Sequence, residues 1–150
     1  MFRKVMIISA VLALAVSLGA HFAISATDTK TEKPSYAKQL VAKCKKTNQP
    51  VTMDQAKTLL AKSGHIFIDV RTEKEFKKGH LPGSINIPRG KLEFVIEKKV
   101  PDYKAKIVIY CKSGGRAALA ACTLRDMGYS NVIAMNQGFD QWAKASLPVE

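Results

Sequence analysis

The 150-residue chain has few acidic residues and few cysteines, and it lacks the common cofactor motifs. Its three cysteines are an odd number, so a closed disulfide framework would leave one thiol over. No His and Cys cluster has metal-ligand spacing and no phosphate-binding glycine fingerprint occurs, so we predict neither a metal nor an organic cofactor. Apolar residues make up 47% of the chain, which excludes global disorder, and the length suits one ordinary domain.

The scarcity of acids leaves a formal net charge of +12, from 24 Lys and Arg against 12 Asp and Glu. Such a balance could indicate a nucleic-acid partner. However, the lysines are scattered rather than interleaved with aromatic residues along one stripe, so we expect no nucleic acid. The better functional interpretation is a basic field that attracts small anions, and the alternative is simple solubility.

Charge is also missing from a long stretch near the N-terminus. Arg3 and Lys4 precede an apolar run over residues 5–20, and small residues follow at 23–26. No charged residue occurs between Lys4 and Asp28. This pattern predicts a signal peptide over residues 1–26 and an exported, periplasmic protein with no stable membrane insertion after cleavage. The alternative is an uncleaved membrane anchor formed by residues 5–24. The apolar run has no cysteine near its end, so the sequence does not support a lipoprotein anchor.

Residues 27–49 are interpreted as a linker followed by a short helix. Residues 28–33 are polar and end at Pro34, and Tyr36, Leu40 and Cys44 then recur at a spacing of four. This spacing predicts one face of an amphipathic helix over residues 35–46, which ends at the breaker cluster 47–50.

From residue 50 onward, short apolar segments alternate with helical ones. This alternation predicts an α/β domain over residues 50–150, with a five-stranded, mostly parallel sheet and helices on both faces. The expected strands cover residues 51–52, 65–70, 84–87, 107–110 and 131–135. The expected helices cover residues 54–62, 73–78, 91–99, 116–127 and 139–144.

The strand over residues 107–110 runs directly into a cysteine and a tight loop before the next helix. The loop reads Cys111-Lys112-Ser113-Gly114-Gly115-Arg116. In a parallel sheet, ligands bind at the carboxyl ends of strands, and the glycines allow the loop to curl its N–H groups inward. These donors, the helix dipole and the charges of Lys112 and Arg116 favour the thiolate of Cys111, which predicts a nucleophile. The alternative is a buried cysteine before an ordinary loop.

Four motifs, in order, resemble the rhodanese family over residues 50–150. Cys111, Gly114 and Arg116 match the pattern Cys-x-x-Gly-x-Arg, and residues 69–71 match its Asp-Val-Arg strand end. Residues 75–88 are similar to the family's Glu-aromatic-x-x-Gly-His signature, and residues 137–142 are similar to its closing Gly-Gly-x-x-x-Trp, with Gln137 in place of the first glycine.

This resemblance implies a rhodanese-like fold and a thiosulfate sulfurtransferase in which Cys111 attacks sulfane sulfur and carries it as a persulfide. The sulfur would pass to a thiophilic acceptor such as cyanide or a thiol, and a protein acceptor is possible. The loop would hold the substrate, with the small anionic donor bound by Lys112, Ser113, Gly114, Gly115 and Arg116.

Two other functional interpretations stay open. The first is a module of the same fold that carries sulfur or binds a protein without significant turnover, with the helix in residues 27–49 as its docking element. The second is a phosphatase or arsenate reductase. Related phosphatases have His-Cys with five residues before the arginine, whereas here four residues separate Cys111 from Arg116 and Tyr110 replaces the histidine.

The remaining polar and sulfur-containing residues have simpler interpretations. Asp69 and Arg71 are candidates for a second layer around the site, although a structural ion pair is the favoured interpretation. We expect His80 to be structural. For Cys122 we favour a buried thiol packed on the sheet, and pairing with Cys44 is the alternative that an oxidising compartment would allow.

Overall fold

The computed structural model describes residues 35–150. The expected signal peptide, the alternative anchor and the first part of the expected linker lie outside the described residues. Within residues 35–150, no helix is long and apolar enough to cross a membrane.

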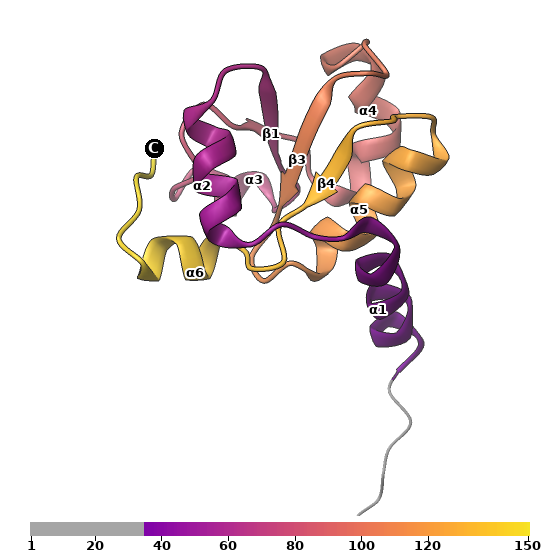
Figure 1. Cartoon of the computed structure of the whole chain (residues 1–150), viewed down its shortest axis with the longest axis horizontal. Helices are drawn as coiled ribbons and strands as arrows, with labels where there is room; N and C mark the ends of the chain where they lie inside the picture. Colours follow the sequence, from indigo (N-terminus) through magenta and orange to yellow (C-terminus); the bar gives the residue numbers. More distant parts are fainter. Residues whose placement is uncertain (1–34) are drawn as a thin grey trace, which may run out of the picture. The chain divides into compact units, whose positions relative to one another are not determined.

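A parallel four-stranded sheet forms the centre of the domain, in the order β2-β1-β3-β4 (Figure 1). The strands are β1 (His65–Asp69), β2 (Ile85–Asn86), β3 (Lys106–Tyr110) and β4 (Val132–Ala134). The helices are α1 (Tyr36–Asn48), α2 (Met53–Ala61), α3 (Glu73–Phe76), α4 (Leu92–Lys99), α5 (Gly115–Asp126) and α6 (Phe139–Lys144), and a 3₁₀ turn, η1 (Arg89–Lys91), precedes α4.

The expected fold class is confirmed, but the expectation of a fifth strand at residues 51–52 is wrong. Val51 forms a single parallel bridge to Met135. The extended segment cannot grow because Pro50 has no N–H to donate and Thr52 already caps α2. Its hydroxyl accepts from the Gln55 N–H while the Gln55 side chain accepts from the Thr52 N–H.

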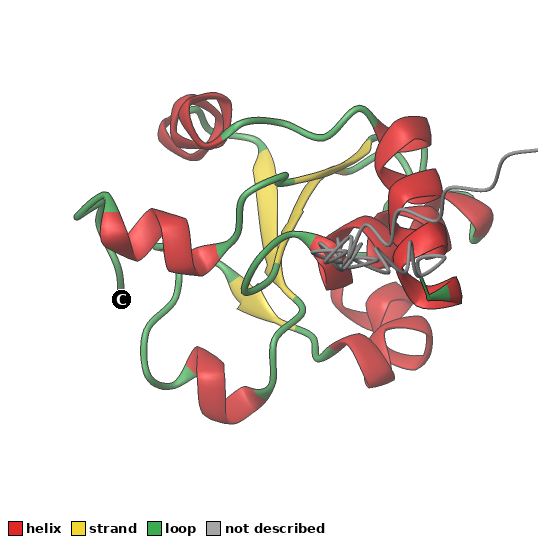
Figure 2. Cartoon of the chain, turned by 90° about the horizontal axis from the view of Figure 1, so that it is seen from below, coloured by secondary structure: helices red, strands yellow, loops and turns green. Residues whose placement is uncertain are grey.

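Helices cover both faces of the sheet (Figure 2). Ile68, Ile109 and their neighbours pack against α4 and α5 on one face. Phe67, Val108 and Tyr110 pack with residues of α2 and α6 on the other face. Strands buried on both sides must be apolar throughout, which explains their continuous runs of Ile, Val and Phe. Each fully buried large side chain contributes about 1.5–3 kcal/mol.

The register of the strands decides which residues meet at the carboxyl end of the sheet. Asp69 at the end of β1 lies opposite Tyr110 at the end of β3 and opposite Asn86 at the end of β2. The residues that follow these strand ends therefore emerge at the same edge, and Cys111 is one of them.

The helix α1 is attached to α5 by a disulfide between Cys44 and Cys122, whose Cα atoms lie 5.9 Å apart. The favoured expectation of a free, sheet-packed Cys122 thiol is therefore wrong, and the alternative pairing holds. Cys122 lies on the side of α5 that meets α1, beside the Nδ2 of Asn48 at 3.4 Å. Sequence spacing could not favour this pairing, because the two cysteines lie 78 positions apart.

Candidate active site

Cys111 lies immediately after β3 at the carboxyl end of the sheet, and it is the free cysteine among the described residues. Its side chain is buried, with 1% of the residue exposed. The main-chain N–H of Phe139 donates to the Cys111 carbonyl at 2.8 Å and thereby fixes the position of the residue. A buried sulfur at a strand end needs hydrogen-bond donors nearby if it is to carry negative charge.

The loop after Cys111 supplies such a donor. The main-chain N–H of Gly114 donates to the Cys111 Sγ at 3.2 Å. Gly114 has a φ of +90° and precedes the first residue of α5, so the helix begins with its N-terminus beside the sulfur. A side chain at Gly114 would overlap the Asn136 carbonyl, so this position requires glycine for two reasons.

A second glycine supports the loop from the other side. A Cβ at Gly138 would overlap the carbonyl groups of Cys111 and Lys112, so the turn before α6 approaches the loop more closely than any other residue would allow. The N–H of Asp140 also donates to the Lys112 carbonyl at 3.2 Å. Sequence analysis did not assign Gly138 to the site, although its place in the closing family motif was an available signal.

Arg116 is held by Glu75 from α3. Its two terminal nitrogens donate to the two carboxylate oxygens of Glu75 at 3.2 and 3.1 Å. The paired guanidinium lowers the pKa of Glu75 to about 2, and further donation from Thr72 contributes. The pKa of Arg116 is raised, first by Glu75 and also by its interaction with Cys111. Arg116 is therefore a fixed cation beside the sulfur.

Sequence analysis placed Glu75 only within the family signature over residues 75–88 and missed this pairing. The capping box that Glu75 forms with Thr72 is local and readable from sequence. Its contact with Arg116 spans 41 residues and has no local signal.

The other predicted loop residues lie around Cys111 on the surface. Lys112 and Ser113 are exposed, and Gly115 is half-buried at the start of α5. The Nζ of Lys112 lies 3.8 Å from the Asp140 carboxylate. A surface hollow of 210 Å³ opens here, lined by Arg71, Glu75, Lys78, Lys112, Phe139 and Asp140. Three cationic and two acidic side chains line this opening, and the remaining single positive charge favours an anionic substrate.

Asp69 and Arg71 form a buried ion pair at 2.7 Å, with 0% and 4% of their side chains exposed. Arg71 also donates to the Gly79 carbonyl at 2.7 Å, and its guanidinium stacks 3.9 Å from the centroid of the Phe139 ring. The pair therefore joins the end of β1 to the turn after α3 and to α6. Arg71 lines the hollow, whereas Asp69 is enclosed behind it.

His80 packs in the turn that follows α3. Its Nδ1 lies 3.1 Å from the Phe76 carbonyl and its ring stacks on the Phe76 ring. Tyr110, which occupies the place of the phosphatase histidine, is buried on the α2 side of the sheet and hydrogen-bonded to Ser84 at 2.8 Å. Burial raises the pKa of Tyr110, so the neutral phenol is the stable form.

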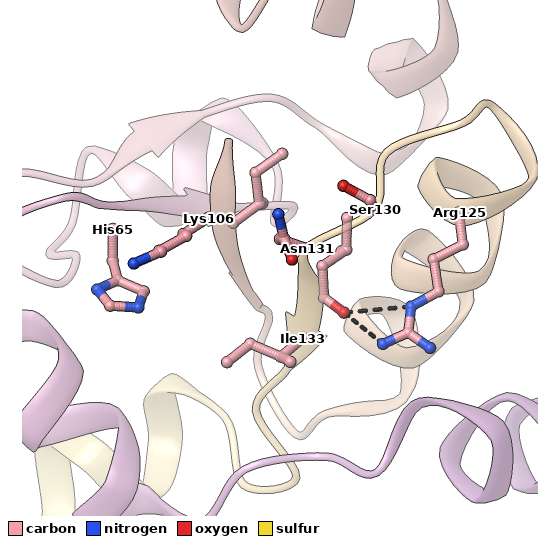
Figure 3. A pocket seen from close by; sticks show the side chains of 8 residues that line it. His65, Lys106, Arg125, Ser130, Asn131 and Ile133 are labelled. Atoms are coloured by element: carbon pink, nitrogen blue, oxygen red, sulfur yellow. Dashed lines mark hydrogen bonds between the residues drawn. The ribbon is translucent and has the colours of Figure 1, made fainter. Parts of the chain in front are cut away.

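A larger hollow of 370 Å³ lies at the opposite end of the sheet, where β1 and β3 begin (Figure 3). His65, Lys106 and Arg125 contribute to its lining. The Nε and Nη2 of Arg125 both donate to the Val132 carbonyl. The smaller opening is the one lined by Lys112, the residue that follows Cys111, whereas this larger hollow lies at the other end of the strands.

With this geometry established, comparison with known proteins gives a consistent result. Residues 52–145 match the model of the Rhodanese-like domain. Thiosulfate sulfurtransferase 18 of Arabidopsis thaliana is 33% identical over 125 residues, which cover 74% of this chain and 91% of that protein.

Two solved structures extend the comparison. One is a protein of unknown function from Rhodopseudomonas palustris, described as a possible tyrosine phosphatase. It is 32% identical with a TM-score of 0.69, and the match covers 79% of this chain and 96% of that chain. The other is a rhodanese from E. coli solved with anions. It is 29% identical with a TM-score of 0.50, and the match covers 57% of this chain and 96% of that chain.

The chain therefore belongs to the rhodanese-like domain family, as its motifs predicted. The relatives support a rhodanese-type sulfurtransferase as its class of activity.

Proposed function

We propose that the protein transfers sulfane sulfur from thiosulfate, or from another sulfane donor, to a thiophilic acceptor through a persulfide on Cys111. The observation that carries the proposal is the position of Cys111. It lies buried at a strand end, receives the Gly114 N–H on its sulfur and has Arg116 beside it. Relatives named thiosulfate sulfurtransferases support thiosulfate as the donor.

The reaction proceeds in two covalent steps. The Cys111 thiolate attacks the outer sulfur of thiosulfate, a Cys–S–S bond forms, and the S–S bond of thiosulfate breaks with its electron pair leaving on sulfite. The acceptor then attacks the terminal sulfur of the persulfide, and the Cys111 thiolate is regenerated. Donors fixed in position before the reaction stabilise the anionic sulfur without rearrangement.

The loop residues divide this work. Gly114 supplies an N–H to the cysteine sulfur, and Gly115 begins the helix whose N-terminus faces it. Lys112 stands at the opening, where it attracts the dianionic donor and the sulfite product. Arg116, fixed by Glu75, contributes its charge beside the sulfur. Ser113 is exposed beside Lys112 and contributes to the binding of the donor.

The test is the formation of thiocyanate from thiosulfate and cyanide, together with intact mass before and after thiosulfate. The wild-type protein should gain one sulfur atom and turn over, and Cys111→Ser should do neither. If both proteins are equally inactive and unmodified, sulfur transfer from thiosulfate is wrong. A stoichiometric gain of sulfur without turnover would instead identify a sulfur carrier.

Phosphatase chemistry fits the site less well. Arg116 already places two nitrogens on Glu75, whereas binding a phosphate uses the same guanidinium face. The loop is also one residue shorter than the phosphatase pattern. Hydrolysis of an aryl phosphate that is lost in Cys111→Ser would reverse this preference.

We also propose that the protein is exported with residues 1–26 removed. The charge and hydropathy pattern of that segment supports this location. The disulfide between Cys44 and Cys122 supports it independently, because disulfides persist in oxidising compartments. The intact mass of the protein recovered from the periplasm tests the cleavage, and a full-length mass in the membrane fraction would favour the anchor.

A further inference from the structure

The helix α1 lies outside the matched family domain, yet it is attached to the catalytic side of the molecule. The family match begins at residue 52, whereas α1 ends at Asn48. The disulfide joins α1 to α5, and α5 is the helix that begins at the end of the Cys111 loop. Figure 1 shows α1 at the end of the domain toward which the strand arrows point.

Polar contacts bring the C-terminal half of α1 close to this loop. The Nζ of Lys45 donates to the Asn136 Oδ1 at 3.0 Å. Asn136 is the residue whose carbonyl lies directly against Gly114. The Nδ2 of Asn48 also donates to the Ala118 carbonyl, one turn into α5, at 3.3 Å. A single residue, Asn136, therefore separates α1 from the loop that holds Cys111.

The charge on α1 is entirely of one sign. The helix carries Lys38, Lys43, Lys45 and Lys46 and contains no Asp or Glu. Lys38, Lys43 and Lys46 are exposed, as is Lys112 at the active-site opening. The facing acids are Asp126, which lines the same groove as Lys43, and Asp140, which is 3.8 Å from Lys112.

Apolar surface accompanies this charge. Tyr36 and Leu40 on α1 are 79% and 37% exposed. Between α1 and α5 lies a groove of 380 Å³, to which Leu40, Leu119 and both disulfide cysteines contribute. Thiosulfate is held at the loop and needs no such groove. Exposed aromatic and aliphatic side chains within a cationic surface are typical of a site for a macromolecule.

We propose that α1 and this groove form a docking surface for a protein that exchanges sulfur with Cys111 through a cysteine set among acidic residues. The inference rests on the proposed sulfurtransferase function and specifies its partner. The charge of α1 selects an acidic surface and accelerates the encounter, and the groove accepts an apolar side chain. The disulfide holds α1 against α5, the helix that begins at the end of the catalytic loop.

The partner's cysteine is the nucleophile that accepts the sulfur. Its thiolate attacks the terminal sulfur of the Cys111 persulfide, the bond from Cys111 Sγ to that sulfur breaks, and Cys111 leaves as the thiolate. The partner retains the sulfur as its own persulfide. No other oxidant or reductant is needed.

Two synthetic acceptor peptides test the proposal. Each has about twelve residues, enough to span about 40 Å when extended, with one cysteine and one leucine. The peptides differ in having glutamates or glutamines at the remaining positions. With saturating thiosulfate as donor, the rate of sulfur transfer to each peptide is compared with the rate to cyanide.

The test variant is Lys43→Glu with Lys46→Glu, and the matched control is Lys57→Glu with Lys62→Glu. Both pairs are exposed lysines, but in the control pair Lys57 lies in the middle of α2 and Lys62 caps its C-terminal end. We expect the wild-type protein to prefer the glutamate peptide. The α1 variant should lose about tenfold in kcat/KM for this peptide, whereas the control variant should lose much less. Turnover with cyanide should stay within about twofold in both variants.

The two possible failures are distinguishable. If cyanide turnover persists but the two variants lose peptide transfer equally, or the peptides do not differ, the docking surface is refuted and the sulfurtransferase stands. If neither cyanide nor peptide receives sulfur, the proposed function itself is wrong, and the docking proposal fails with it.

Discussion

The loop around Cys111 and the helix α1 both contact Asn136, but they are held in place by different means. Main-chain packing fixes the loop, with Gly114 against the Asn136 carbonyl and Gly138 against the Cys111 and Lys112 carbonyls. A covalent bond and a few side-chain hydrogen bonds attach α1. The reaction requires hydrogen-bond donors in fixed positions. A main-chain N–H such as that of Gly114 meets this need because, unlike a side chain, it cannot change rotamer. A docking element needs to be attached to the domain more than it needs a precise geometry, and the disulfide attaches α1 in this way.

The largest expected effect concerns the attachment of α1. Replacing both Cys44 and Cys122 with serine should lower the free energy of unfolding by about 4 kcal/mol, because the disulfide closes a long loop in the unfolded chain. Urea denaturation of both proteins without reductant measures this difference. Thiosulfate turnover under folding conditions should persist, because the loop is held independently.

A phosphine reductant provides the control. It should lower the stability of the wild-type protein to that of the serine variant and leave the variant unchanged. Equal midpoints for the two proteins without reductant would show that the disulfide does not hold α1.

The second effect concerns the loop. Gly114→Ala should cost about 3 kcal/mol, because alanine strains a φ of +90° and its Cβ overlaps the Asn136 carbonyl. Gly115→Ala, at the adjacent position with open space around the added Cβ, should change stability by less than about 1 kcal/mol. Thermal unfolding of the two variants makes the comparison. Similar losses in both would contradict the close approach at Gly114.

The smallest effect concerns the ion pair that fixes Arg116. Glu75→Gln should cost about 1 kcal/mol at neutral pH, since both partners are about one third exposed and solvent weakens the pair. The pKa of Glu75 is about 2 when folded, against 4.5 ordinarily. The stabilisation is therefore complete above pH 4.5 and is lost as the pH falls toward 2.

Denaturation at neutral pH and at about pH 3 measures this dependence. The difference in the free energy of unfolding between wild type and Glu75→Gln should be smaller in acid. Glu73→Gln is the control, because Glu73 pairs with Lys91 on the exposed surface. A gap that stays constant with pH would mean that Glu75 acts through packing rather than charge.

The part of the site that was predictable from sequence is contiguous in the chain. A strand, a cysteine, two glycines and a helix follow one another over residues 106–126, and each step has a local physical reason. The two faces of the sheet were likewise predictable, because strands buried on both sides need uninterrupted apolar runs.

What could not be predicted depends on contacts between distant residues. Glu75 and Arg116 are 41 positions apart, and a surface carboxylate has many potential partners. The disulfide joins cysteines 78 positions apart; the pairing was an alternative from sequence, but no local signal favoured it over a free thiol. The supposed strand at residues 51–52 failed because the capping of α2 took precedence over pairing. Signal cleavage and export stay predictions, because they depend on residues before 35.

The bond between Cys44 and Cys122 has a topological consequence. It converts the chain between them into a covalent ring that contains β1, β2, β3 and Cys111. A protease that cuts one exposed segment of this ring leaves both fragments linked, so the nicked molecule migrates as a single species until a reductant separates it. In a compartment that contains proteases, one cleavage there does not release the polypeptide that carries the nucleophile.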